Sequence, residues 1–142
     1  MGSALVPFSR TYDEALAMTV EARNYMTHGS AGRDFPRPRT NASPDLKVCC
    51  EALRVTSRLT QVMAWLMLQR AVQDGEISAE EACGEHNRLA GHDVCLDTAG
   101  EEDVSLPVGL RSLLDRSYRL YRRVSRLEDR LLAHWTDNNP LQ

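Results

Sequence analysis

Lysine, aromatic residues and long apolar runs are all scarce in this chain. Lys47 is the single lysine among 17 basic residues, and aromatic residues make up 6% of the 142 residues. Few aromatic residues and few β-branched runs argue against a β-sandwich or barrel, because strands favour those residues. Leucine, alanine, arginine and glutamate dominate the periodic segments, and these residues favour helices. The composition therefore predicts an all-α protein.

The chain also lacks the usual signs of a membrane protein, an exported protein or an enzyme. Its apolar run from Val62 to Leu68 is far shorter than the roughly 20 residues that span a bilayer. No secretory apolar segment precedes the first expected helix, so we expect a cytoplasmic protein. A glycine-rich phosphate loop, paired carboxylates on an apolar helix face and a nucleophile beside a base are missing. We therefore expect no catalytic and no cofactor-binding residues.

Apolar periodicity predicts a single helical-bundle domain over residues 1–142. The apolar residues recur every three or four positions, which is the spacing of one face of a helix. We expect three long helices and one short helix, at about residues 12–27, 44–74, 79–89 and 107–135. Thr11 and Glu14 suggest a capping box for the first helix, and Gly75 a left-handed end for the second. Glycine, proline and acidic residues between the helices make 29–42 and 90–106 the expected flexible connectors.

The second expected helix contains the most informative segment, SRLTQVMAWLMLQRAV at residues 57–72. Its apolar run includes Trp65 and leaves no solvated face, so other helices must enclose it. The helix carries two apolar rows: Leu46, Cys49, Leu53, Thr56, Thr60, Met63 and Met67, then Val48, Ala52, Val55, Leu59, Val62 and Leu66. A helix with two such rows contacts more than one neighbour.

The last expected helix has the clearest periodicity in the chain. Its heptad seam consists of Leu110, Leu113, Ser117, Leu120, Val124, Leu127 and Leu131. Flanking apolar residues make the stripe wider than a two-stranded coiled coil requires and suit a bundle. The wide stripe and the two rows together present more apolar surface than three packed helices can cover. Because dimerisation would cover the excess, we expect a homodimer.

Charge is segregated along the chain, whose net charge is −3. Nine acidic residues and only Arg88 fall between residues 76 and 103, whereas seven arginines and three acidic residues fall between 107 and 135. The overall acidity argues against indiscriminate binding of nucleic acid or membranes. The arginines lie opposite the seam, where they form either a solvated face or a surface for an acidic partner or phosphates. The partner-binding residues that we expect are Arg37, Arg39, Arg119, Arg122, Arg123 and Arg126.

Cys83, His86, His92 and Cys95 suggest a metal site with the spacing C-x2-H-x5-H-x2-C. Cysteine and histidine are the ligands that zinc prefers. The central spacer is much shorter than the dozen or so residues of usual zinc modules, however. We expect no bound metal and keep a zinc-dependent module as an alternative.

The chain resembles the alphaproteobacterial RcdA family, the regulators of CtrA degradation. The resemblance lies in SRLTQVMAWLMLQRAV, in the following Asp74-Gly75-Glu76-Ile77-Ser78, and in Leu106-Pro107 with the arginine-rich leucine seam. It implies a small dimeric helical-bundle adaptor that helps a primed ClpXP protease, with its priming factors, receive cell-cycle regulators as cargo. The resemblance identifies no individual partner-binding residues in this chain, because the matching segments are mainly apolar core. The alternative is a nucleic-acid-binding helical regulator that uses the arginine-rich last helix.

Overall fold

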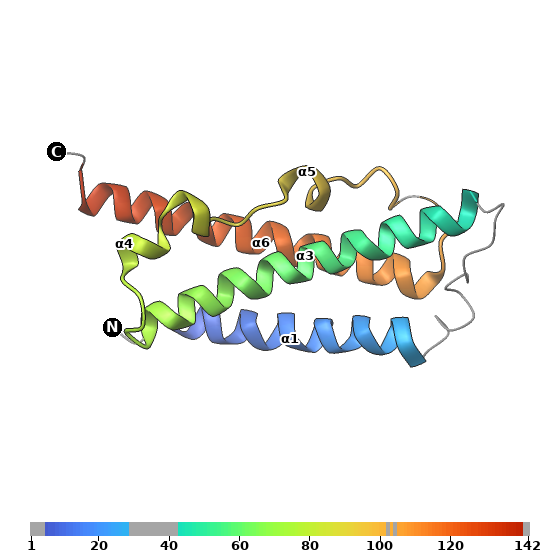
Figure 1. The fold of residues 1–142 in the computed structure, drawn as a ribbon, viewed down its shortest axis with the longest axis horizontal. Coiled ribbons are helices and arrows are strands. Elements are labelled where there is room, and N and C mark those ends of the chain that lie inside the picture. Colours follow the sequence, from blue (N-terminus) through green and yellow to red (C-terminus); the bar gives the residue numbers. More distant parts are fainter. Residues whose placement is uncertain (1–4, 29–42, 102, 104, 141–142) are drawn as a thin grey trace.

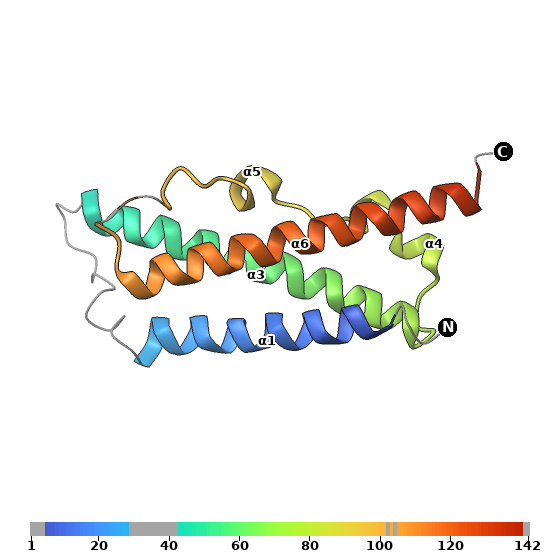
Figure 2. The same ribbon diagram turned by 180° about the vertical axis from the view of Figure 1, so that it is seen from behind.

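Three long helices lie side by side in the computed structural model, which describes residues 5–28, 43–101, 103 and 105–140. They are α1 (Leu5–His28), α3 (Ser43–Gln73) and α6 (Val108–Asn138). Between α3 and α6 the chain forms α4 (Ala79–Ala82), a 3-10 turn η2 (Glu85–Asn87) and α5 (His92–Cys95). Helix α5 lies on the side of α3 and α6 that faces away from α1, whereas α4 lies near the C-terminal ends of α3 and α6 (Figure 1 and Figure 2). The described residues contain no strand, so the predicted all-α class is confirmed.

The central helix α3 packs against both α1 and α6, as predicted, although only one of its two apolar rows is buried. One row is buried in the core, and Trp65 beside it is only 4% exposed. The other row faces outward, with Leu46, Leu53 and Met67 exposed by 67%, 66% and 57%. The expectation that α3 has no solvated face is therefore wrong. The bundle encloses the side of α3 that contains Trp65 and leaves the opposite side open.

The helix α6 follows its predicted heptad seam. The first five seam residues are buried, and Leu127 and Leu131 are partly buried against the same core. Towards the C-terminal end the carboxylate of Glu128 is also buried on this stripe. The helix begins after Pro107 and ends at Asn138, close to the predicted bounds.

The end of α3 also agrees with the prediction. Gly75 has a φ of +76°, which is the left-handed conformation that glycine adopts without a steric cost. The Glu76 amide donates to the carbonyl of Ala71 at 2.9 Å, and the Gly75 amide donates to Val72 at 3.1 Å. These two bonds satisfy carbonyl groups that a helix end leaves without partners.

The predicted start of the first helix is wrong, because α1 begins at Leu5 rather than near Tyr12. Pro7 lies in the first turn, where backbone amides lack intrahelical partners in any case. Phe8 then packs against Trp65 with 5.7 Å between ring centroids, which favours the extra turns through tertiary contact. Thr11 is consequently buried inside the helix instead of capping it.

The segment between α3 and α6 differs most from its prediction. The expected helix at 79–89 breaks after Ala82, because Gly84 adopts an extended conformation before η2. The cap at Ser78 does form, since its hydroxyl accepts a hydrogen bond from the Glu81 amide at 3.1 Å. Within the expected connector at 90–106, α5 forms and Cys95 is fully buried, whereas most of the other described residues there are exposed. The other connector, 29–42, lies outside the described residues.

Candidate partner-binding surfaces

A single buried arginine of α3 joins this helix to the segment before α6. The Arg58 side chain is fully buried. Its guanidinium donates hydrogen bonds to Cys95 O at 2.8 Å, Leu114 O at 2.8 Å, Asp97 O at 3.1 Å and Ser117 Oγ at 3.3 Å. The Glu101 carboxylate lies 3.0 Å from the same group, and the Tyr118 ring centroid lies 5.2 Å from it. Arg58 therefore fixes residues 95–101 against α3 through their backbone.

The ion pair of Arg58 and Glu101 is formed at a cost in hydration. Burial lowers the pKa of Arg58 and raises the pKa of Glu101, while each charge shifts the pKa of its partner in the opposite direction. Removing one member would leave the other without its partner in a largely dry environment, which is strongly unfavourable. The pair thus ties the connector to the core, a role that sequence periodicity did not reveal.

Several acidic residues of the segment at 76–103 form ion pairs with α3. Besides Glu101, Asp97 lies 3.5 Å from Arg54, and Asp103 forms an ion pair with Lys47. The hydrogen bond from Lys47 lowers the pKa of Asp103 well below its usual range. The exposed acidic residues of this segment that have no ion pair among the described residues are Glu76, Glu80, Glu81, Glu85 and Asp93. The free acidic surface is therefore concentrated on and around α4.

Five of the seven arginines of α6 fall into two groups. Arg119, Arg122 and Arg126 are exposed on the outer side of the helix, and Arg119 makes an i,i+4 ion pair with Asp115 at 3.3 Å. Arg123 instead reaches Glu14 of α1 at 2.5 Å. A neighbouring pair joins Arg116 to Glu21 with two bonds of 2.6 Å and lowers the pKa of Glu21.

Of the predicted partner-binding residues on α6, one is paired with α1 and three are not. Arg123 holds α6 against α1, whereas Arg119, Arg122 and Arg126 form a basic face that is available to a partner. We call these three residues the arginine face. Arg37 and Arg39 lie outside the described residues.

The four residues of the zinc alternative are not assembled into a site. Cys95 is buried beside Arg58 and Tyr121, and Cys83 lies on the other side of Gly84 and η2. Burial raises the pKa of both thiols, which disfavours the thiolate that zinc requires. Within the described parts of the chain, no three histidine, cysteine or acidic side chains are grouped closely enough to hold a metal ion.

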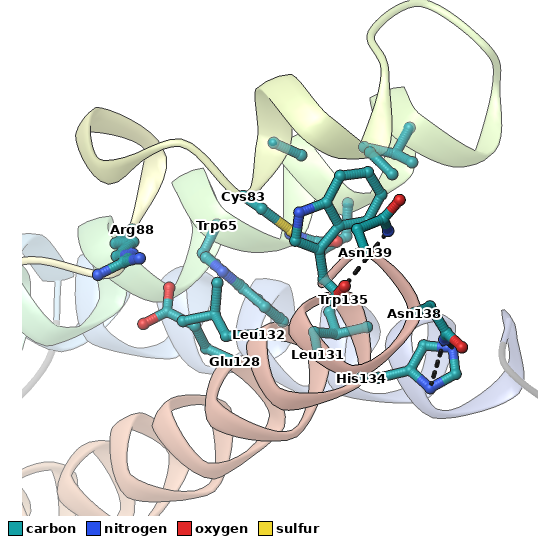
Figure 3. A pocket seen from close by; sticks show the side chains of 14 residues that line it. Trp65, Cys83, Arg88, Glu128, Leu131, Leu132, His134, Trp135, Asn138 and Asn139 are labelled. Carbon is teal, nitrogen blue, oxygen red and sulfur yellow. Dashed lines mark hydrogen bonds between the residues drawn. The ribbon is translucent and has the colours of Figure 1, made fainter. Parts of the chain in front are cut away.

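A groove opens where the ends of α3 and α6 meet α4 (Figure 3). Its volume is about 350 Å³, and the apolar side chains lining it include Trp65, Val72, Ala82, Leu131, Leu132 and Trp135. Glu128 forms part of the wall, is only 7% exposed, and accepts a hydrogen bond from the Leu89 amide at 2.6 Å. Burial raises the pKa of this carboxyl group. No local sequence pattern indicates this groove, because three separate elements create it.

The geometry defines a small helical-bundle protein with an arginine face, an exposed apolar row and an apolar groove. None of its described helices is long and apolar enough to cross a bilayer. Residues 3–142 match the family described as "Protein of unknown function (DUF1465)".

Among solved structures, the crystal structure of RcdA from Caulobacter crescentus CB15 matches with a TM-score of 0.68 and 36% sequence identity. The match covers 89% of this chain and 91% of that chain. No curated protein matches the chain. The chain belongs to the RcdA family, as the segment around Trp65 predicted.

Proposed function

We propose that this protein is a non-enzymatic, cytoplasmic adaptor that helps deliver regulatory proteins to the ClpXP protease. The observation that supports this most is the 36% identity to RcdA over 89% of the chain. The mechanism is tethering: the adaptor contacts cargo and protease-side partners together, which raises the effective concentration of cargo at the protease. No bond is made or broken by the adaptor itself.

The charge distribution supports simultaneous binding of two partners. The arginine face lies on α6, whereas the exposed acidic residues Glu80 and Glu81 lie on α4. Opposite charges on separate elements give partners of different charge separate docking surfaces. Contacts of this kind speed association and weaken as salt rises.

Reversing the arginine face is expected to reduce delivery of at least one cargo severalfold. Arg119, Arg122 and Arg126 make no contact with α1 among the described interactions, so their replacement by glutamate should leave folding intact. The measurement is the rate of cargo loss in a reconstituted reaction of ClpXP, its priming factors and this protein. The matched control replaces the same three residues by lysine, which keeps the charge and should retain delivery.

Two results of this comparison would count against the proposed docking surface. Equal delivery rates for the glutamate and lysine variants would show that the arginine face does not contact a partner. Tight, salt-sensitive binding of DNA that the glutamate variant loses would instead favour the nucleic-acid-binding alternative, because phosphate contacts release counterions.

We also propose that the protein forms a homodimer through the exposed row of α3. Light scattering at micromolar concentration should give twice the chain mass of 16.0 kDa. Replacing Leu46 and Leu53 by glutamate should halve that mass, because two charges would be buried in an apolar interface. Val108→Glu is the control, since Val108 is 80% exposed on a different helix. A monomeric wild-type protein, or a dimer that survives the double substitution, would refute this interface.

A further inference from the structure

The groove between α3, α4 and α6 has the shape of a site for an extended chain. The residues of α6 that line it run from Glu128 to Asn139. At 1.5 Å per residue this stretch is about 16 Å long. An extended peptide advances about 3.3 Å per residue, so the groove accommodates about five residues. A stretch of this length matches a short extended polypeptide segment.

The chemistry of the groove combines an apolar floor with one buried carboxylate. Leu131, Leu132 and Trp135 supply apolar surface that is partly exposed, and Trp65, which is only 4% exposed, forms the base of the groove. One oxygen of Glu128 is occupied by the Leu89 amide, and the described interactions give its other oxygen no hydrogen-bond partner. A donor group bound beside this carboxylate would gain a charge-assisted hydrogen bond in a partly dry environment.

Charged residues of both signs lie around the groove. Exposed Glu80 and Glu81 lie on α4, whose Ala79 and Ala82 line the groove. Arg88 also lines the groove, and its charge lowers the pKa of Glu128 against the larger effect of burial. It is exposed and forms no ion pair with Glu128 among the described residues, so the carboxylate remains open to a donor from a partner.

We propose that this groove binds an extended peptide segment of a partner protein, with an apolar side chain between Trp65 and Trp135 and a lysine or arginine beside Glu128. This inference rests on the proposed adaptor function in one respect only: it assumes that the partner is a protein. Its test uses the purified chain without a protease, so the two proposals fail independently. Success would identify a second docking surface besides the arginine face.

Intrinsic fluorescence measures occupancy of the groove without a label, because both tryptophans of the chain line it. The probes are the hexapeptide acetyl-GKLFKG-amide, its acidic counterpart acetyl-GELFEG-amide, and decanoate as an apolar anion. The lysine peptide should shift the tryptophan emission in a saturable manner. The acidic peptide and decanoate should bind at least about tenfold more weakly, which corresponds to one favourable charge contact.

Three variants distinguish the groove from a general charge effect. Glu128→Gln keeps an acceptor for the Leu89 amide and should weaken the lysine peptide about tenfold. Asp129→Asn is its matched control, because Asp129 is the exposed neighbour on the same helix and should change the affinity less than twofold. Ala79→Phe places a large side chain at an exposed position of the lining and should weaken binding further.

Several results would overturn the proposal. One is the absence of any saturable shift with the lysine peptide up to about 1 mM, the weak limit of useful affinity. Others are equal affinity for the acidic peptide or for decanoate, and equal losses for Glu128→Gln and Asp129→Asn. An emission change that depends on protein concentration alone and disappears in Ala79→Phe would show that a second copy of the chain occupies the groove instead. Circular dichroism of each variant confirms that it is folded.

Discussion

Replacing Arg58 by alanine is expected to lower the free energy of unfolding by about 3 to 5 kcal/mol. The fully buried guanidinium donates to backbone carbonyls of two different segments, Cys95 and Asp97 before α6 and Leu114 within it. Its removal leaves these carbonyls and the Glu101 carboxylate without their partner. Unsatisfied buried polar groups cost more than the hydrogen bonds contribute when they are formed.

Urea unfolding at a fixed protein concentration measures this loss. Arg70→Ala is the matched control, because Arg70 is exposed and only stacks over the Tyr12 ring at 5.6 Å. An exposed cation–π contact contributes about 1 kcal/mol at most. Equal losses in the two variants would show that Arg58 does not organise the connector.

Replacing Trp65 by alanine should cost about 3 to 5 kcal/mol, the range for a large aromatic residue buried in a core. Trp65 is 4% exposed and packs edge-on against Phe8 of α1, with 63° between the ring planes. Both the core and the start of α1 should therefore loosen. The same urea experiment measures the loss, and the emission of Trp135 remains as a probe.

Met67→Ala is the control for Trp65, since Met67 lies on the exposed row of the same helix. Surface substitutions of this kind change stability by about 0.5 kcal/mol or less when no partner covers them. Measuring at low protein concentration keeps the proposed dimer from adding to this value. A loss below about 1 kcal/mol for Trp65→Ala would contradict the burial of this helix face.

Local sequence signals were sufficient for α3 and α6. The heptad seam and Gly75 act within a few residues of where they occur, so their patterns are readable without tertiary information. The start of α1 was not predictable in this way, because Phe8 is held by Trp65 from another helix. The ordered conformation of residues 90–101 was equally unpredictable from the sequence. It depends on hydrogen bonds from Arg58 to backbone carbonyls, and backbone groups carry no sequence signature.

The candidate surfaces were predictable to different degrees. The phase of the seam placed Arg119, Arg122 and Arg126 on the outside, where the structure has them. It did not separate Arg123, whose partner Glu14 is 109 residues away in the sequence. The burial of Glu128 was predictable but was missed. Glu128 follows Val124 by four residues and Tyr121 by seven, and helical spacing therefore places it on the same buried stripe as these two residues. A carboxylate in such a position indicates either a buried polar contact or a binding site.

The reconstituted degradation reaction tests the central claim most directly. Cargo turnover is measured with ClpXP and every priming factor present, first without this protein and then with it added. An adaptor of the RcdA family should accelerate the loss of selected cargo regulators, and the acceleration should rise with adaptor concentration before falling when excess adaptor binds cargo and protease separately. Unchanged turnover of every cargo tested, with and without the protein, would contradict the adaptor function.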